Sequence, residues 1–305
     1  MARSRMRTRL GSLELRSPLI AASGTVGSVW EWASVADVSA YGAAVAKSVS
    51  AEPWSGQPAP RLAPTGVGML NSIGIQNPGI HAWAQKMKGH RAAIDVPIWG
   101  SAVGGSVGEF AEVAKGLEGA GVPAIEVNLS CPNLENGEMF SFDPALSAGV
   151  VREVISSVTV PVGAKLSPNT PDLVEVAKGC MDAGAEFLTL TNSALGFGLS
   201  IESRRPLLSA GEGGYSGPGL KPISLRCVFE VARALPGTPI VGCGGVASGR
   251  DVVEYLMAGA SAVALGTIHL AEPKAGVRIM RELQRELTRL GVGSVKELIG
   301  SVEPW

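Results

Sequence analysis

The chain has 305 residues, of which 46% are hydrophobic, 17% charged and 5% aromatic, and 40 are glycine. Its 26 Lys and Arg residues against 27 Asp and Glu leave a net charge of −1, so no overall field attracts nucleic acid or an anionic membrane. The ample apolar fraction argues against a disordered chain, and the absence of a G-x-y repeat argues against collagen.

Eight short apolar segments are predicted strands. Several of them follow a proline that marks a turn, as in Val96-Pro97 and Val160-Pro161. The predicted strands cover residues 19–22, 43–46, 98–100, 124–129, 162–165, 187–190, 240–242 and 262–265.

Longer segments with helical spacing of apolar residues lie between most of these strands. The clearest predicted helices cover residues 110–120, 145–157, 172–183, 223–234, 252–258 and 275–290. Strands that read as buried on both faces and alternate with helices favour a parallel barrel over an antiparallel sheet.

We therefore predict an α/β fold in which residues 1–305 form a single domain, a (β/α)8 TIM barrel. Residues 6–15 are expected to form an N-terminal hairpin under the barrel. Long loops are expected after strands 2, 4 and 6. Two of them, residues 50–77 and 195–219, exceed simple connections, and loops of that length are usually functional.

The cysteines and apolar runs indicate the compartment. Four cysteines are scattered without a CxxC pair, which argues against a zinc site, an iron–sulfur cluster or a disulfide framework in this chain. No apolar run approaches the ~20 residues of a membrane helix, and no signal peptide is recognisable. We expect a cytoplasmic protein with no bound metal. The alternating arginines from Arg3 to Arg9 leave two readings open, a basic surface arm or a fraying terminus.

The predicted strand ends carry the candidate site. In a barrel of this kind, active-site groups lie at the C-terminal ends of the strands. Here those ends hold polar side chains and glycines, namely Ser23, Lys47, Ser48, Ser101, Asn128, Lys165, Thr191, Asn192, Ser193, Gly244, Gly245, Gly266 and Thr267.

Two glycine pairs among these ends indicate a phosphate site. Gly244-Gly245 and Gly266-Thr267 follow the seventh and eighth strands, where barrels often bind phosphate through backbone N–H groups. Ordinary loop glycines remain the alternative for either pair alone.

Lys47 and Lys165 lie at strand ends, where a lysine that points into the barrel mouth needs an anion or an electron-rich ring. One of them could stabilise a reduced flavin, and a surface lysine is the alternative for each.

Asn128 offers a donor and an acceptor together, which suits an imide ring. Cys131 follows it in a loop, and its Asn and Pro neighbours favour a functional thiol over inert packing. We expect the other three cysteines to pack.

The predicted loop after the second strand contains polar and apolar residues with a glycine break, namely Asn71, Ser72, Ile73, Gly74 and Ile75. This pattern fits a loop folded over a planar polar ligand. A plain Ω-loop remains open from this stretch alone.

These motifs together resemble the class 1 dihydroorotate dehydrogenases, and within them the catalytic subunit of the class 1B type. The resemblance extends over nearly the whole chain. It is carried by residues 18–25, 69–79, 128–133, 165–169, 213–218, 242–246 and 264–267. The absence of the membrane-binding extension of class 2 enzymes, and a Cys in place of their Ser, argue against class 2.

The resemblance implies an FMN enzyme that oxidises dihydroorotate to orotate in pyrimidine synthesis. It implies that Cys131 removes the C5 proton while hydride leaves C6 for flavin N5. FMN would be held by Ser23, Lys47, Ser48, Ser101, Asn128, Lys165, Thr191, Gly217, Gly244, Gly245, Gly266 and Thr267. The pyrimidine would be bound by Lys47, Asn71, Ser72, Ile73, Gly74, Ile75, Asn128, Asn192 and Ser193. At Ser101 the family commonly has Asn, which puts that flavin contact in doubt.

The resemblance also implies a separate electron-transfer subunit that carries FAD and a 2Fe-2S cluster and passes electrons to NAD, in a homodimer or heterotetramer. Three alternatives stay open. They are a class 1A-like enzyme that uses fumarate, a dihydropyrimidine dehydrogenase-type subunit that acts on uracil or thymine, and a flavin-binding paralogue without turnover.

Overall fold

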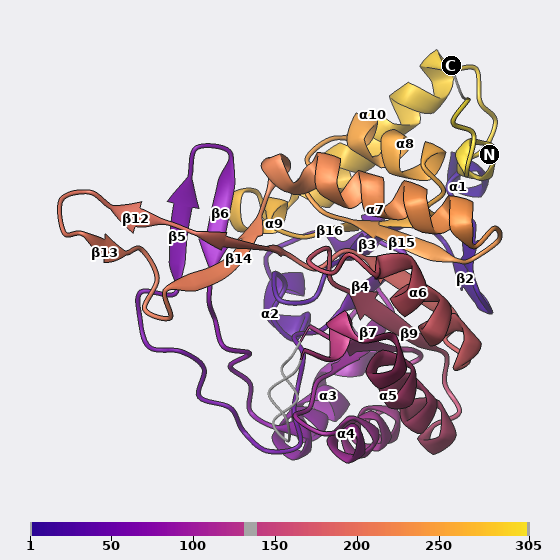
Figure 1. Ribbon diagram of the computed structural model, residues 1–305. Coiled ribbons are helices and arrows are strands. Elements are labelled where there is room, and N and C mark those ends of the chain that lie inside the picture. The colour runs from indigo at the N-terminus through magenta and orange to yellow at the C-terminus, as the bar shows by residue number, and fades with distance from the viewer. Residues whose placement is uncertain (1, 131–138, 304–305) are drawn as a thin grey trace.

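The structure, a computed structural model, describes residues 2–130 and 139–303 (Figure 1). Its centre is a closed barrel of eight parallel strands, in which the last strand pairs with the first. The barrel strands are β3 (Leu19–Ala21), β4 (Ala43–Val45), β7 (Ile98–Ala102), β8 (Ile125–Asn128), β9 (Val162–Leu166), β10 (Phe187–Leu190), β15 (Ile240–Cys243) and β16 (Ala262–Leu265). The predicted TIM barrel is confirmed, and each predicted strand overlaps one of these eight.

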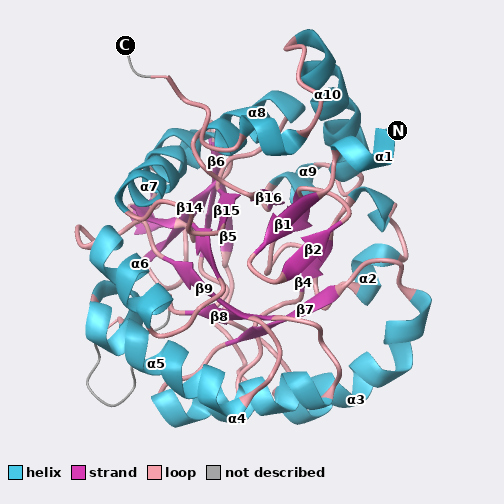
Figure 2. Cartoon of the chain, turned by 90° about the vertical axis from the view of Figure 1, so that its right-hand side faces the viewer, coloured by secondary structure: helices cyan, strands magenta, loops and turns pink. Residues whose placement is uncertain are grey.

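An outer ring of helices surrounds the barrel (Figure 2). Its members are α3 (Ile80–His90), α4 (Val107–Gly119), α5 (Pro144–Ser157), α6 (Leu173–Asp182), α7 (Lys221–Ala234), α8 (Gly249–Met257) and α10 (Ala275–Arg289). Shorter helices are α1 (Ala2–Arg5), α2 (Trp30–Ala33) and α9 (Ile268–Ala271), and 3-10 turns cover Val38–Ala40, Arg91–Ala93, Phe140–Phe142, Pro218–Leu220 and Val295–Leu298. None of the helices in residues 2–130 and 139–303 is long and apolar enough to cross a membrane.

Side-chain caps explain where several helices begin. Asp143 accepts a hydrogen bond from the backbone N–H of Leu146, and Pro144 occupies the first turn of α5. Ser248 and Asp251 form a reciprocal capping box at the start of α8. These caps start both helices one to three residues before the first residue expected from apolar spacing.

Helix α3 was not among the expected helices. Its buried residues Ile80, Trp83 and Met87 are spaced by three and four, which is the spacing of one helix face. The neighbouring glycine-rich segment, residues 66–79, conceals this signal.

The expected N-terminal hairpin is formed by β1 (Thr8–Leu10) and β2 (Leu13–Leu15). It lies at the N-terminal ends of the barrel strands, where the Thr8 hydroxyl donates to the carbonyl of Ser261, just before β16. Leu10 and Leu15 pack with Trp99 and Phe187 in a cluster that fills this end of the barrel. One end of the barrel is therefore closed by apolar packing, and the opposite end is left for the site.

The long segments after the second and sixth barrel strands form a sheet rather than loops. Residues from both segments pair in the order β11-β14-β6-β5. This roof sheet consists of β5 (Leu62–Thr65), β6 (Gly68–Asn71), β11 (Ala194–Phe197) and β14 (Glu212–Ser216), with a small extension of β12 (Leu199–Ser200) and β13 (Arg205–Pro206). Figure 1 shows it standing away from the barrel at the left. Part of the long segment after the fourth strand, residues 131–138, lies outside the described residues.

Packing at the closed end of the barrel gives a stability prediction. Gly163 lies opposite Phe187 in the pairing of β9 with β10, and a Cβ at Gly163 would overlap the buried Phe187 ring. Because the ring packs on Trp99 at 5.3 Å between centroids, it has little room to move. Gly163→Ala is expected to lower the free energy of unfolding by about 1–3 kcal/mol, measured by urea denaturation.

Gly149→Ala is the matched control. Gly149 lies within α5, and a Cβ there would meet open space. Since alanine is the better helix former, this variant is expected to gain about 0.5–1 kcal/mol. Equal stability of the Gly163 variant and the wild type would contradict the packing argument.

Candidate active site

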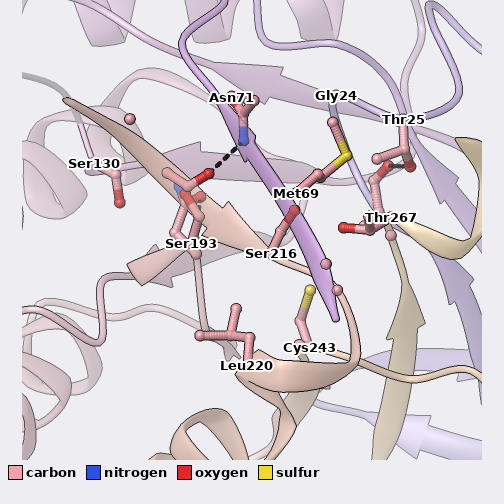
Figure 3. A pocket seen from close by; sticks show the side chains of 18 of the residues that line it. Gly24, Thr25, Met69, Asn71, Ser130, Ser193, Ser216, Leu220, Cys243 and Thr267 are labelled. Carbon is pink, nitrogen blue, oxygen red and sulfur yellow. Dashed lines mark hydrogen bonds between the residues drawn. The ribbon is translucent and has the colours of Figure 1, made fainter. Parts of the chain in front are cut away.

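A cavity of about 1010 Å³ lies between the C-terminal ends of the barrel strands and the roof sheet (Figure 3). Every candidate site residue in the described part of the chain lines this cavity except Ser101. Cys131, the candidate base, lies outside the described residues. The barrel and the roof thus bring together positions from residue 22 to residue 271.

Ser101 is fully buried behind the cavity wall. Its Oγ lies 2.9 Å from the Oγ of Ser48, which does line the cavity. Ser101 itself is not among the residues that line the cavity, and its direct contact with the cofactor stays a prediction. Its contact with Ser48 makes it at least an indirect part of the site.

Two asparagines on the wall are linked in a hydrogen-bonded chain. Asn192 Nδ2 donates to Asn128 Oδ1 at 3.2 Å, and Asn128 Nδ2 donates to Ser48 Oγ at 3.3 Å. The backbone N–H of Ser193 donates to Asn192 Oδ1 at 2.8 Å. The chain orients both amides at the wall, as a site for a ring with alternating donors and acceptors requires.

Asn71 links two strands of the roof sheet, and Asn169 ties the roof to the barrel rim. Asn71 Nδ2 on β6 donates to the carbonyl of Gly214 on β14 at 3.1 Å, as the dashed line in Figure 3 shows. Asn169, which follows β9, accepts from the N–H of Leu195 at 2.9 Å and donates to the carbonyl of Ser193 at 3.2 Å. Asn71 therefore lies on a strand of the roof, although the sequence predicted a loop there.

Lys165 is 6% exposed, and the barrel interior provides its polar surroundings. Its Nζ donates to Ser23 Oγ at 3.4 Å, and Ser23 in turn lies 3.4 Å from a carboxylate oxygen of Glu126. Glu126 is 3% exposed and accepts a 2.7 Å hydrogen bond from Thr189. A buried lysine and a buried carboxylate thus lie close together, which lowers the cost of burying either charge. Glu126 was not a candidate; an acidic residue inside an apolar strand is the signal that points to it.

The two glycine loops after β15 and β16 expose unused backbone donors. The N–H groups of Gly244, Gly245, Gly266 and Thr267 donate to no acceptor within the described part of the chain. Gly244 and Gly245 have φ values of +141° and +69°, which side chains rarely adopt. Because all four residues line the cavity, their amides suit an oxyanion such as a phosphate group.

Cys243, at the end of β15, was expected only to pack. It is 8% exposed and lines the cavity, and Figure 3 shows it beside the glycine loop. Burial raises its pKa, so it is a neutral thiol at neutral pH. Over residues 2–130 and 139–303, no group of three His, Cys, Asp or Glu side chains is placed to hold a metal ion.

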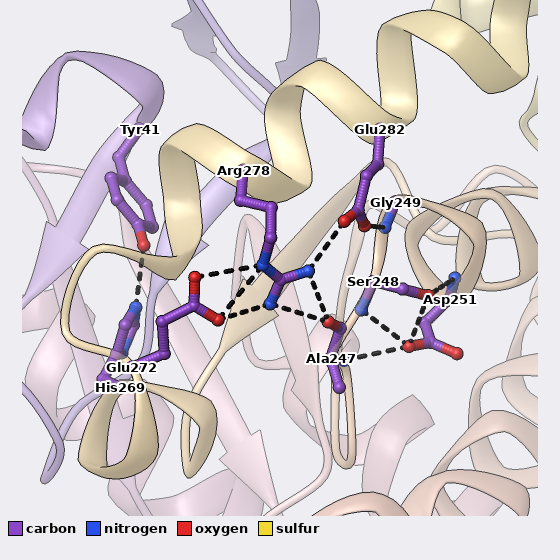
Figure 4. Close-up of polar contacts among 9 residues, drawn as sticks. All are labelled: Tyr41, Ala247, Ser248, Gly249, Asp251, His269, Glu272, Arg278 and Glu282. Atoms are coloured by element: carbon purple, nitrogen blue, oxygen red, sulfur yellow. Dashed lines mark hydrogen bonds and ion pairs between the residues drawn. The ribbon is translucent and has the colours of Figure 1, made fainter.

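A directional hydrogen-bonded chain fixes the rim at β3 and α9 (Figure 4). The Tyr41 hydroxyl contacts His269 Nε2 at 2.8 Å. His269 Nδ1 lies 3.2 Å from the Thr25 hydroxyl, which donates to the carbonyl of Ala22 at 3.0 Å. With the Thr25 proton used in this way, Nδ1 carries the imidazole proton and Nε2 accepts from Tyr41. The chain holds Thr25, a cavity residue, in one orientation.

Known proteins match the chain across this whole region. A family model described as dihydroorotate dehydrogenase matches residues 5–287. A relative from Citrifermentans bemidjiense, called "Dihydroorotate dehydrogenase B (NAD(+)), catalytic subunit", is 41% identical over 305 residues and covers 99% of this chain and 100% of its own length. The chain belongs to the dihydroorotate dehydrogenase family. A relative of the same description from Desulforudis audaxviator is 40% identical over 294 residues, which are 96% of this chain and 95% of the relative.

These matches confirm the resemblance to the class 1B catalytic subunit. A solved structure, the dihydroorotate dehydrogenase of Eimeria tenella in complex with ferulenol, superposes with a TM-score of 0.82. It is 19% identical and covers 97% of this chain and 88% of its own, so the likeness bears on the fold alone.

The buried histidine gives a pH prediction. Burial lowers the pKa of His269 from 6.5 to about 4. The unfolded chain therefore binds a proton below pH 6.5 that the folded chain does not, and the free energy of unfolding falls as the pH drops from 6.5 toward 4. Because of this histidine, the free energy of unfolding is expected to fall by roughly 2 kcal/mol between pH 7 and pH 5, as measured by urea denaturation.

His269→Gln is expected to flatten that dependence, whereas the control His81→Gln, at an exposed position on α3, is expected to leave it unchanged. If the free energy of unfolding depended on pH in the same way in the His269 variant and the wild type, the pH dependence would not come from His269.

Proposed function

We propose that this chain is the catalytic subunit of a dihydroorotate dehydrogenase that oxidises dihydroorotate to orotate in pyrimidine synthesis, with FMN as its bound cofactor. The observation that carries the proposal is the meeting of the motif residues from seven strand ends and the roof sheet around one cavity. Full-length similarity to type B catalytic subunits supports it.

The cavity wall has the donor set that FMN requires. The free amides of Gly244, Gly245, Gly266 and Thr267 match a phosphate, and Lys165 supplies a cation that matches the electron-rich N1/O2 edge of a reduced flavin. FMN, when bound, supplies the acceptor for the hydride that leaves C6 of the substrate. The further cofactor residues in the proposal are Ser23, Lys47, Ser48, Asn128, Thr191 and Gly217, with Ser101 acting through Ser48.

A second set of cavity residues is proposed to bind the pyrimidine. The linked amides of Asn128 and Asn192 offer the donors and acceptors that an imide needs. Asn71 adds a third side-chain amide from the roof. Lys47 supplies a cation for the carboxylate. The remaining proposed contacts are Ser72, Ile73, Gly74, Ile75 and Ser193.

Cys131 is proposed as the base that takes the C5 proton. The proposal rests on its place in the motif of residues 128–133, which follows β8. The roof covers one side of the cavity. A site closed to water would let a thiol serve as base although its ordinary pKa of about 8.5 does not favour that role.

A separate subunit is proposed to take the electrons onward. The relatives are named as catalytic subunits of an NAD(+) enzyme. We propose a partner with FAD and a 2Fe-2S cluster, with this chain in a homodimer or a heterotetramer, in the cytoplasm. That residues 1–305 form one FMN-binding domain stays a prediction.

Substrate choice can be tested by anaerobic flavin reduction. Dihydroorotate is expected to bleach the bound flavin, and dihydrouracil, which lacks the carboxylate proposed to bind Lys47, is expected to reduce it far more slowly. Absorbance near the flavin maximum, followed in a stopped-flow instrument, gives both rates. Reoxidation by fumarate, NAD or a quinone then reports the electron acceptor. Bleaching by dihydrouracil alone would overturn the proposed substrate.

Cys131→Ser tests the base. Because a hydroxyl is a far weaker acid than a thiol, this variant is expected to slow flavin reduction by roughly 10²-fold or more and to retain FMN. Cys180→Ala on α6, outside the cavity lining, is the control and is expected to reduce at the wild-type rate. Unchanged kinetics in Cys131→Ser would remove it from the base role.

A further inference from the structure

Arg278 on α10 connects the two glycine loops from outside the cavity (Figure 4). It does not line the cavity, and no motif of the resemblance includes it. Its guanidinium nevertheless binds acceptors in two segments outside α10, the loop after β15 and the residue after α9, and it binds a third acceptor, Glu282, on α10 itself.

The first segment is the loop after β15. Both terminal nitrogens of Arg278 donate to the carbonyl of Ala247 at 3.2 Å. The N–H groups of Ala247 and Ser248 donate to Asp251 at 2.9 and 2.8 Å. The second half of this loop is therefore fully hydrogen-bonded, whereas the first half, Gly244 and Gly245, presents free donors.

The second segment is the one after β16. Glu272, just beyond α9, accepts from Arg278 Nε at 3.0 Å and from Nη2 at 2.6 Å. Gly266 and Thr267 lead into the same short helix, whose His269 is tied to Tyr41. The position of α9, and with it the free amides of Gly266 and Thr267, is thus held at both ends.

The third acceptor links Arg278 indirectly to the start of α8, through Glu282 on α10. Glu282 accepts from Arg278 Nη1 at 2.8 Å and also from the backbone N–H of Gly249 at 2.8 Å. The guanidinium is therefore the common partner of the loops after β15 and β16.

We propose that Arg278 is a positioning residue for the phosphate subsite: it sets the spacing of the two glycine loops, so that their free amides converge on one phosphate group. This inference rests on the proposed function, since it takes FMN as the ligand. Arg278 contributes no donor to the phosphate itself and acts through the carbonyl of Ala247 and the carboxylate of Glu272.

Arginine is suited to this role in a way that lysine is not. Its planar fork presents five N–H donors in fixed directions, whereas lysine presents a compact point charge on a flexible stem. Arg278→Lys therefore keeps the positive charge but cannot hold Ala247, Glu272 and Glu282 at once. The variant therefore distinguishes two roles of Arg278: holding the glycine loops in place, which lysine cannot do, and attracting an anion by its charge, which lysine can do.

The test compares FMN with riboflavin, which has the same ring and lacks the phosphate. The full chain, freed of flavin, is titrated with each flavin and binding is followed by quenching of flavin fluorescence. Arg278→Lys is expected to raise the Kd for FMN about tenfold, the size expected when a charge-assisted hydrogen bond is lost, and to leave the Kd for riboflavin within about twofold. Arg289→Lys is the matched control, because Arg289 lies on the same helix in an exposed pair with Glu286.

Each outcome decides the inference. An unchanged Kd for FMN, or an equal loss for both flavins, overturns it, because a purely structural role would not distinguish the phosphate. Glu272→Gln, which weakens only the link to α9, is expected to show the same selective loss and replaces Arg278→Lys if that variant does not fold. A wild-type chain that binds neither flavin overturns the proposed function itself, and a wild type that binds FMN with no selective loss in the variants overturns only the role of Arg278.

Discussion

Closure of the parallel barrel is the constraint on which the rest of the molecule depends. Because all eight strands run in one direction and β16 pairs with β3, their C-terminal ends meet at a single rim. Residues far apart in the chain, such as Ser23 and Thr267, then line the same cavity. The opposite end is filled by Trp99, Phe187 and the N-terminal hairpin, so the barrel has one open end. A ring of polar groups that would be unfavourable inside a core becomes the wall of a site.

The wall of the cavity is polar, and several of its side chains and loops are hydrogen-bonded to residues that do not line the cavity. Ser101 supports Ser48, and Glu126 with Ser23 accompanies Lys165. Arg278 supports the glycine loops from outside. The backbone amides of the two glycine loops keep their donors unused within the described residues, while the groups behind them are hydrogen-bonded within the chain. This division of roles is the arrangement expected of a preorganised site, in which the binding groups do not have to be reoriented when the ligand arrives.

Local sequence patterns predicted the parts of the molecule that local physics determines. Short apolar runs identified all eight barrel strands, and glycines identified the two loops with free amides. The roof sheet escaped prediction because β6 and β14 pair across more than a hundred residues and contain several glycines, so neither has a strand pattern of its own. That Ser101 contacts Ser48 and does not line the cavity could not be predicted for a related reason, since whether a strand-end side chain faces the cavity or its neighbour depends on the barrel and not on the strand.

The composition of the roof has a consequence for how the protein is made. One half of the roof comes from residues 62–71 and the other from residues 194–216, and the glycine loops follow later still. All of the roof is therefore synthesised before the two glycine loops that complete the wall of the cavity. A site that needs both parts is complete only after the last barrel strand has been made. Binding of the proposed cofactor is in this sense an event of the completed chain.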